Sequence, residues 1–408
     1  MGESASQPLP DIPSIAVMPF ENLSGDPGQE YFSDGITVTL ITDLSRLQNL
    51  FVIARDSTFT YKGKNVDARQ VGRDLGVKYL LEGSVQRDGD RVRINAQLID
   101  SASGSHLWGE RFDQPAGDIF AIQDEIKRRI VARLDVNVGG EEARVWRRAT
   151  TNPAAYDLFL QAQDAFYRVT EPSVARAIEL FDQAIKLDSQ FALAITLRGF
   201  AYQTQFYSGW ARPREQSAQL AVAEAEKALR LDPQLIEAHT LLGVMYMHLG
   251  RLDEGLAELE RAVTLNPNNA FASIFYSNAL SNLGRGKVAL PPAERAMRVN
   301  PFPPHWYLHV LGNAYSAAGD TDRAVETYED CVRRLPDFQW CHKELAIQYA
   351  RLGRIDEAKA RLREVLRINP SFDMRQALSW QTPGAFQEAQ RAALIQAGLP
   401  DQVLDLRR

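Results

Sequence analysis

Short apolar runs alternate with segments of helical periodicity at the start of the chain. Ile15–Phe20 is a continuous apolar run, typical of a strand that is buried on both faces. After a loop at Glu21–Gln29, apolar residues recur at every fourth position and predict a helix that ends near Leu47. Leu50–Arg55 is predicted as a second strand and Val66–Leu75 as a second helix.

From Val77 onward, apolar and polar residues alternate with a period of two. This pattern predicts two strands joined at Asp88-Gly89, because glycine tolerates the positive φ angle of a tight hairpin. A third strand at His106–Phe112 and a closing helix at Asp118–Leu134 follow. The order β-α-β-α-β-β-β predicts an α/β fold with a mixed sheet, one face covered by helices and the other exposed to solvent.

Beyond residue 150 the pattern is helical throughout and it repeats. Similar sequence motifs of the type Leu-Asn-Pro end at prolines that are spaced by 34, 34, 35 and 34 residues. These prolines are Pro233, Pro267, Pro301, Pro336 and Pro370. Small residues such as Gly312 recur where two helices would cross closely. A 34-residue period resembles that of tetratricopeptide repeats, which are helix–turn–helix units that stack into a solenoid. Two more divergent units precede Pro233, so we expect six repeats.

These patterns divide the chain into five predicted segments. They are a disordered tail at 1–13, an α/β domain with its closing helix at 14–140, a linker at 141–154, six tetratricopeptide repeats at 155–370, and a capping helix and tail at 371–408. The cap is expected at Pro383–Gln396, where it would cover the apolar face that a solenoid end otherwise exposes.

Five stretches of the first domain resemble the TolB-N-terminal-like, or FlgO-like, domain. They are Ser14–Pro27, Glu30–Ile36, Phe51–Arg55, Leu81–Val85 and Ile119–Ile126. The closing stretch Leu394–Pro400 is also similar to the end of that family. The resemblance implies a domain commonly followed by tetratricopeptide repeats, often behind a class III adenylate/guanylate cyclase domain or a winged-helix transcription-factor domain. Roughly 13 residues precede the first strand, so we expect neither effector within this chain.

Composition narrows the class of protein further. The 408 residues are 45% apolar and 24% charged, as in ordinary globular proteins. Residues 1–140 hold 15 Lys and Arg against 20 Asp and Glu, and the remainder holds 31 against 32. Neither part has the basic surplus that nucleic-acid binding requires, so we expect no nucleic-acid partner.

The apolar runs reach five or six residues, which is too short to cross a bilayer, so we expect no membrane partner. Met1–Pro13 lacks the basic start and apolar middle of a secretory signal. Two cysteines in the whole chain are typical of a reducing compartment. We therefore expect a cytoplasmic protein.

No arrangement of residues with a recognisable catalytic pattern is found. A class III cyclase needs two metal-binding carboxylates on neighbouring strands, whereas Asp56 stands alone after the second predicted strand. Neither a phosphate-binding loop nor a Gly-x-Gly-x-x-Gly stretch occurs, and Gly25–Gly28 reads as a turn. We predict no catalytic residues, no cofactor and no enzyme activity in this chain. A hydrolase or transferase hidden in the α/β domain is the alternative.

Histidines and cysteines offer two weaker candidates. His305 and His309 lie four apart on one predicted helix and could supply two ligands to a metal ion, but they lack Cys neighbours or a Glu between them. We therefore predict no metal site. Cys331 and Cys341 flank the Pro336 turn and could approach within disulfide range, although we favour small buried thiols.

A second stripe on the first helices of repeats four to six lies about 100° from the core stripe. It consists of Phe271, Asn278, Asn282, Trp306, His309, Asn313, Trp340, Lys343 and Arg351. By resemblance to tetratricopeptide domains, this stripe would line the concave groove that binds extended peptides or helices. Asparagine side chains can bond a ligand backbone, Lys343 and Arg351 can pair with a carboxylate, and the tryptophans offer contact area. The alternative is a solvated inner face with aromatic packing between repeats.

These expectations converge on a non-catalytic scaffold for protein–protein interaction and signalling, with a protein or peptide partner in the groove. The alternative is the regulatory C-terminal region of a nucleotide cyclase, acting in cAMP signalling, or of a transcription regulator, with the effector domain outside this chain.

Overall fold

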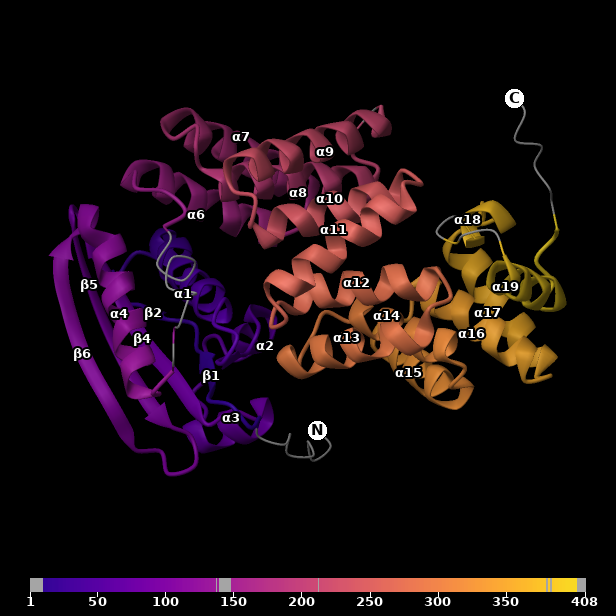
Figure 1. The fold of residues 1–408 in the computed structure, drawn as a ribbon, viewed down its shortest axis with the longest axis horizontal. Coiled ribbons are helices and arrows are strands. Elements are labelled where there is room, and N and C mark those ends of the chain that lie inside the picture. The colour runs from indigo at the N-terminus through magenta and orange to yellow at the C-terminus, as the bar shows by residue number, and fades with distance from the viewer. Residues whose placement is uncertain are drawn as a thin grey trace. The chain divides into compact units, whose positions relative to one another are not determined.

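The computed structural model describes residues 10–136, 138, 148–211, 213–378, 381 and 384–401. The contacts divide the chain into two compact units (Figure 1). The first unit comprises Met1–Met245 together with Arg261–Ala270 and Val299–Phe302. The second comprises Tyr246–Glu260, Phe271–Arg298 and Pro303–Arg408.

The first unit contains the mixed sheet that the alternating pattern predicts. Its strands are β1 (Ser14–Val17), β2 (Glu21–Asn22), β3 (Phe51–Val52), β4 (Tyr79–Asp88), β5 (Arg91–Asp100) and β6 (His106–Pro115), in the order β3-β1-β4-β5-β6, with β2 also paired to β4. β1 runs parallel to both β3 and β4, whereas β4, β5 and β6 form an antiparallel meander. Gly89 has a φ of 59° in the predicted hairpin turn, a conformation that glycine adopts without strain.

Four helices accompany this sheet: α1 (Glu30–Ser45), α2 (Arg55–Phe59), α3 (Ala68–Leu75) and α4 (Ile119–Arg133). Two of them, α1 and α4, share one core with the strands. Ile36 and Leu40 of α1 and Ile126 of α4 are fully buried there with Leu81 and Ile94 of the sheet. Apolar burial is therefore the main force that holds α1 and α4 to the strands.

Two local predictions differ from the structure. The stretch at Glu21–Gln29 was expected to be a loop, but it contains strand β2 and a 3-10 turn, η1 (Pro27–Gln29). Leu50–Arg55 was expected to be one strand, but β3 ends at Val52 and α2 begins at Arg55. The Ala54 amide donates to the Val299 carbonyl at 2.9 Å, so the chain leaves the sheet there.

Paired helices follow the sheet in the sequence. In the first unit they are α6 (Pro153–Tyr167) with α7 (Glu171–Leu187), and α8 (Ala192–Ser208) with α9 (Arg214–Leu231). Asn152 caps α6 by accepting the amides of Ala154 and Ala155. A Cβ on Gly35 of α1 would lie 2.6 Å from Leu160 of α6, so this close approach requires glycine.

The paired helices continue along the chain. The helices are α10 (Ile236–His248), α11 (Leu252–Leu265), α12 (Ala270–Asn282), α13 (Gly286–Val299), α14 (Trp306–Ala318), α15 (Thr321–Arg334), α16 (Gln339–Arg351) and α17 (Ile355–Ile368). Helices α10 to α13 include residues of both units, and α14 to α17 lie in the second unit. A Cβ on Gly312 would lie 2.3 Å from the buried ring of Tyr328, which confirms the predicted close crossing. The helical-repeat architecture is confirmed, while the exact domain limits predicted from the sequence stay a prediction.

The C-terminal part contains α18 (Met374–Leu378) and α19 (Ala385–Gln396). Helix α19 matches the cap expected at Pro383–Gln396 except at its start, where Pro383 lies outside the described residues. Leu394 is fully buried, and α19 packs on α16.

The expectation of free thiols is wrong, because Cys331 and Cys341 form a disulfide. The turn between α15 and α16 brings their Cα atoms to 6.4 Å, within the range that a disulfide spans. The cytoplasmic location, inferred partly from the low number of cysteines, therefore stays a prediction. Among the described helices, none combines the length and apolar character that a membrane span requires.

Candidate functional site

The nine residues of the predicted groove stripe lie on α12, α14 and α16, all within the second unit. These are the first helices of three successive pairs. The structure brings neighbouring members of the stripe into contact at three places along the helices: an aromatic group, an amide group and an ionic group.

The aromatic group lies at the starts of α12 and α14. The ring centroids of Phe271 and Phe275 are 4.8 Å apart, and those of Phe275 and Trp306 are 5.4 Å apart. Phe271 is 39% exposed, so this group, here called the aromatic ledge, offers apolar area to solvent. The stripe predicted from the sequence missed Phe275, although its spacing of four from Phe271 places both on one helix face.

The amide group lies further along the same two helices. The Asn278 side-chain oxygen accepts long hydrogen bonds from Asn282 at 3.4 Å and from Asn313 at 3.5 Å. The Tyr328 hydroxyl donates to the Asn313 oxygen at 2.8 Å and fixes the orientation of that amide. All three asparagines are partly exposed. Their remaining donors and acceptors suit the backbone of a ligand.

The ionic group joins α14 to α16. His309 Nε2 lies 3.9 Å from Glu344 Oε1, and burial lowers the pKa of His309. Burial acts to raise the pKa of Glu344, but the Lys343 ammonium and His309 outweigh it and hold this pKa at about 2. Lys343 is 4% exposed, pairs with Glu344 and donates to the Ala377 carbonyl at 3.5 Å. The structure therefore gives Lys343 an internal partner, whereas the sequence led us to expect a cation facing the groove.

The other stripe residues of α16 differ in exposure. The Trp340 ring lies 6.0 Å from Phe372, a residue that follows α17. Arg351 is exposed, and its Nη1 lies 3.4 Å from Ser316 Oγ. Lys343 is thus the one buried residue among the nine of the stripe, whereas Phe271 and Arg351 are exposed and the other six are partly exposed. That this surface binds a partner stays a prediction.

The two-histidine candidate gains no cluster of further ligands among the residues that the structure describes. His305 is exposed at the start of α14. Across the residues described, no group of three or more His, Cys, Asp or Glu side chains is arranged to hold a metal ion.

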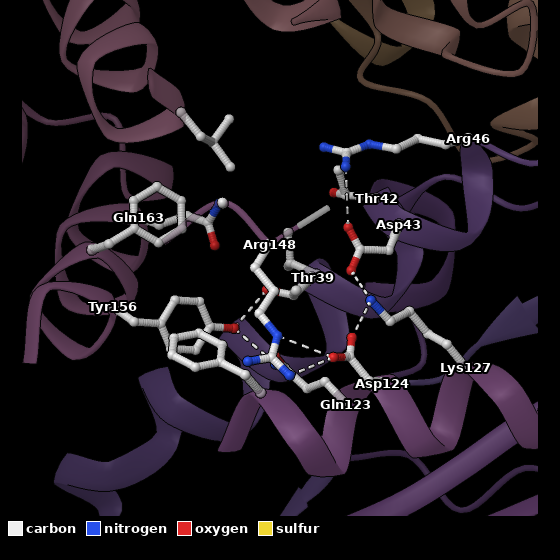
Figure 2. A pocket seen from close by; sticks show the side chains of 15 residues that line it. Thr39, Thr42, Asp43, Arg46, Gln123, Asp124, Lys127, Arg148, Tyr156 and Gln163 are labelled. Carbon is white, nitrogen blue, oxygen red and sulfur yellow. Dashed lines mark hydrogen bonds and ion pairs between the residues drawn. The ribbon is translucent and has the colours of Figure 1, made fainter. Parts of the chain in front are cut away.

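A separate cavity of about 50 Å³, lined by both apolar and polar side chains, lies in the first unit, between α1, α4 and α6 (Figure 2). The buried Lys127 ammonium is 2.8 Å from Asp43 and 3.0 Å from Asp124. Arg148 donates to the other oxygen of Asp124 through two of its nitrogens, at 3.0 and 2.8 Å. These charges alternate in sign, which offsets the cost of burying Lys127, Asp43 and Asp124.

Tyr156 forms the other wall of this cavity (Figure 2). Its hydroxyl accepts from Gln123 at 2.8 Å and shares a 2.8 Å hydrogen bond with Thr39. Burial raises the pKa of Tyr156 to about 12, so the phenol is neutral. A volume of 50 Å³ suits a few water molecules, and the cavity is better explained as a polar joint between helices than as a reaction centre.

Three family models match parts of the chain. A model of the second domain of HilA/YgeH-like transcriptional regulators matches residues 11–129. Two tetratricopeptide repeat models match residues 236–269 and 315–380. The helical region therefore contains tetratricopeptide repeats, and its architecture is that of a protein-interaction scaffold. The resemblance of the first domain to TolB-N-terminal-like domains stays a prediction.

A curated relative extends the likeness. The Rhizobium meliloti (strain 1021) protein named "Putative adenylate cyclase 3" is 43% identical over 247 residues. The match covers 60% of this chain and 42% of the relative. The chain thus spans less than half the length of that relative.

Solved structures with helical repeats are also similar to this chain. One is YrrB, a TPR protein with an unusual peptide-binding site, at 20% identity over 49% of this chain and 96% of YrrB, with a TM-score of 0.35. Another is MamA from Desulfovibrio magneticus RS-1, at 20% identity over 43% of this chain and 97% of MamA, with a TM-score of 0.34.

Proposed function

We propose that this chain is a non-catalytic signalling scaffold that binds a protein partner on the inner face of α12 and α14. One observation carries the proposal: the partly exposed aromatic ledge lies beside the amide group of Asn278, Asn282 and Asn313 on the same two helices. Aromatic area supplies affinity, and amide groups bond a peptide backbone in any sequence context.

The charges near this surface favour a peptide with an acidic residue at one end. Arg351 is exposed at the end of α16, and Asn282 occupies the corresponding last position of α12. An apolar side chain on the aromatic ledge and a carboxylate near Arg351 would set the direction of the bound peptide.

A matched pair of substitutions tests this proposal. Phe271→Asp places a charge on the aromatic ledge, whereas Val288→Asp places one on α13 at a side chain that is 57% exposed. We expect partners captured by the wild-type chain to be retained by V288D and lost with F271D, with a Kd at least tenfold weaker by calorimetry. Equal affinities for the two variants would contradict binding at the aromatic ledge.

A second candidate function is regulation of a nucleotide cyclase or of a transcription regulator. It is supported by the likeness to the R. meliloti relative and by the regulator-domain model that matches residues 11–129. Because no paired metal-binding carboxylates occur in the sequence, any catalytic domain would lie outside this chain.

Replacement of the matching 247-residue region in the R. meliloti relative by this chain tests the second candidate. We expect the rate of cAMP formation to change when the region is deleted and to return when this chain takes its place. An unchanged rate after deletion would exclude regulation of the cyclase by this region.

A further inference from the structure

Helix α19 departs from the packing pattern of the paired helices. The first helix of a pair packs mainly on the second helix of its own pair, as α8 does on α9 and α16 on α17, and less extensively on the second helix of the pair before it. In contrast, α19 packs chiefly on α16, which is itself a first helix. The stripe predicted to line the groove lies on the first helices, so α19 sits on a stripe-bearing helix.

The C-terminal segment covers part of the stripe of α16. Ile347 lies four residues from both Lys343 and Arg351 of the stripe, and it is fully buried in one apolar cluster with Leu394 and Ala393 of α19. The preceding residues add to this cover, since Phe372 lies against Trp340 and the Ala377 carbonyl accepts from Lys343.

The start of α19 reaches towards the end of α12. A Cβ built on Gly284, just beyond α12, would lie 3.3 Å from the Cβ of Phe386. Phe386 and Leu394 thus contact elements that are two repeats apart in the sequence. The helix extends along the first helices rather than continuing the stack of pairs.

One leucine and small or polar residues form the buried face of α19 in the described part of the chain. Its buried side chains are Gln390, Ala393 and Leu394, and Ala397 and Leu399 follow. Arg391 pairs with Glu388 and Asp401, both within the same described segment. A helix of 12 residues is marginal on its own, so α19 gains its helical structure by docking.

We propose that α19 is an intramolecular ligand of the groove, held on α16, and that it competes with any partner helix that extends from α14 onto α16. The partner segment that fits this surface is an amphipathic helix with a narrow apolar face of small residues around one leucine. This inference depends on the proposed function in one respect, namely that the partner binds on α14 before it reaches α16. Docking of α19 on α16 does not depend on it.

A matched pair of substitutions in the full-length chain tests the docking. Leu394→Asp charges the buried contact, whereas Ile395→Asp charges the next residue, which is 43% exposed. The probe is a fluorescein-labelled peptide of residues 384–401, titrated by anisotropy. We expect L394D to bind this peptide at least tenfold more tightly than the wild type or I395D, because only L394D frees the surface. A peptide that itself carries L394D should not bind.

Hydrogen exchange on the same variants separates the remaining outcomes. We expect L394D to speed exchange in α19 and along the face of α16, while α14, α15 and α17 keep their protection. Loss of protection throughout α14–α17 would show that α19 is an integral part of the fold, and absence of peptide binding with those helices intact would exclude the docking surface. Neither result involves the partner captured through Phe271, so the two proposals can fail separately.

Discussion

Ser57 and Asn300 are 243 residues apart in the sequence, yet the Ser57 hydroxyl donates a 2.6 Å hydrogen bond to the Asn300 side-chain oxygen. Asn300 is fully buried, and its amide nitrogen donates to Asp56 at 3.2 Å. The Phe302 amide donates to Ser57 at 2.8 Å. Asn300 belongs to the repeated Asn-Pro motif, but within the first unit its side chain also forms hydrogen bonds to Asp56 and Ser57, which follow strand β3.

A second turn of the same kind contacts the α/β part of the first unit. The buried Asn268 side chain donates to the Leu50 carbonyl at 3.1 Å and to the Leu47 carbonyl at 3.4 Å. The Asn266 side chain donates to Ser45 at 3.3 Å. The turns between repeats thus satisfy backbone carbonyls at the end of α1, which buried polar groups require.

Substitution of Asn300 by alanine should lower the free energy of unfolding by about 1–3 kcal/mol, because it leaves buried polar partners unsatisfied. Ser57→Ala should have a similar effect. In a double-mutant cycle, the double variant should lose less stability than the sum of the two single losses, by a coupling energy of about 1 kcal/mol. Urea denaturation of the four proteins measures this coupling, and strictly additive losses would show that the hydrogen bond contributes nothing to stability.

The sequence was most informative where many residues repeat one pattern. The period-two strands and the 34-residue proline spacing predicted the sheet and the paired helices, because burial of apolar faces imposes those periods. Short elements such as β2 and α2 were missed because two to five residues carry no period. Their structure depends on distant contacts, such as the hydrogen bond from Ala54 to Val299.

The candidate site was predicted only in part for a related reason. Helical spacing placed Phe271, Asn278 and Trp306 on one predicted groove face, and the structure brings each of them into contact with a neighbouring aromatic or amide side chain. That this face binds a partner stays a prediction. No spacing rule shows which charges will pair, so the buried link from Lys127 to Asp43 and the pairing of Lys343 with Glu344 were not predicted. The sequence favours free thiols over the disulfide, because sequence distance alone does not fix the 6.4 Å approach of Cys331 and Cys341.

Lys127→Met should destabilise the protein by about 3–5 kcal/mol, because it leaves the carboxylates of Asp43 and Asp124 beside a cavity without their shared cation. Arg128→Met is the matched control. It removes the same charge one residue away, where the side chain is exposed and pairs with Glu125, so its effect should stay below about 1 kcal/mol. Urea unfolding measures both, and equal losses would contradict a special role for the buried ammonium.

Acidification should weaken the second unit through His309. Burial lowers the pKa of His309, so the unfolded chain binds a proton at a higher pH than the folded chain does. The stability present above the ordinary histidine pKa is therefore lost as the pH falls through it, by at most about 1.4 kcal/mol per pH unit for one proton. Glu344, whose pKa is about 2, continues the loss below the ordinary glutamate pKa.

Urea midpoints at pH 7.5, 6.5 and 5.5 test this dependence. His309→Gln should reduce the slope of the urea midpoint against pH. Part of the slope should remain in this variant, because burial also lowers the pKa of His342. His305→Gln, at an exposed position on the same helix turn, should retain the wild-type slope. A wild-type slope in the H309Q variant would show that His309 does not contribute to the pH dependence.

Reduction of the Cys331–Cys341 disulfide should lower the free energy of unfolding by about 2–3 kcal/mol. The bond joins residues ten apart in the sequence, and closure of a loop of that size restricts the unfolded chain by this amount. Dithiothreitol should therefore shift the urea midpoint of the wild type and leave that of the C331A/C341A double variant unchanged. Alkylation in denaturant without reductant, followed by mass spectrometry, checks the pairing itself. Two alkylated cysteines in freshly purified protein would show that the thiols are free, and the double variant should then be as stable as the wild type with or without dithiothreitol.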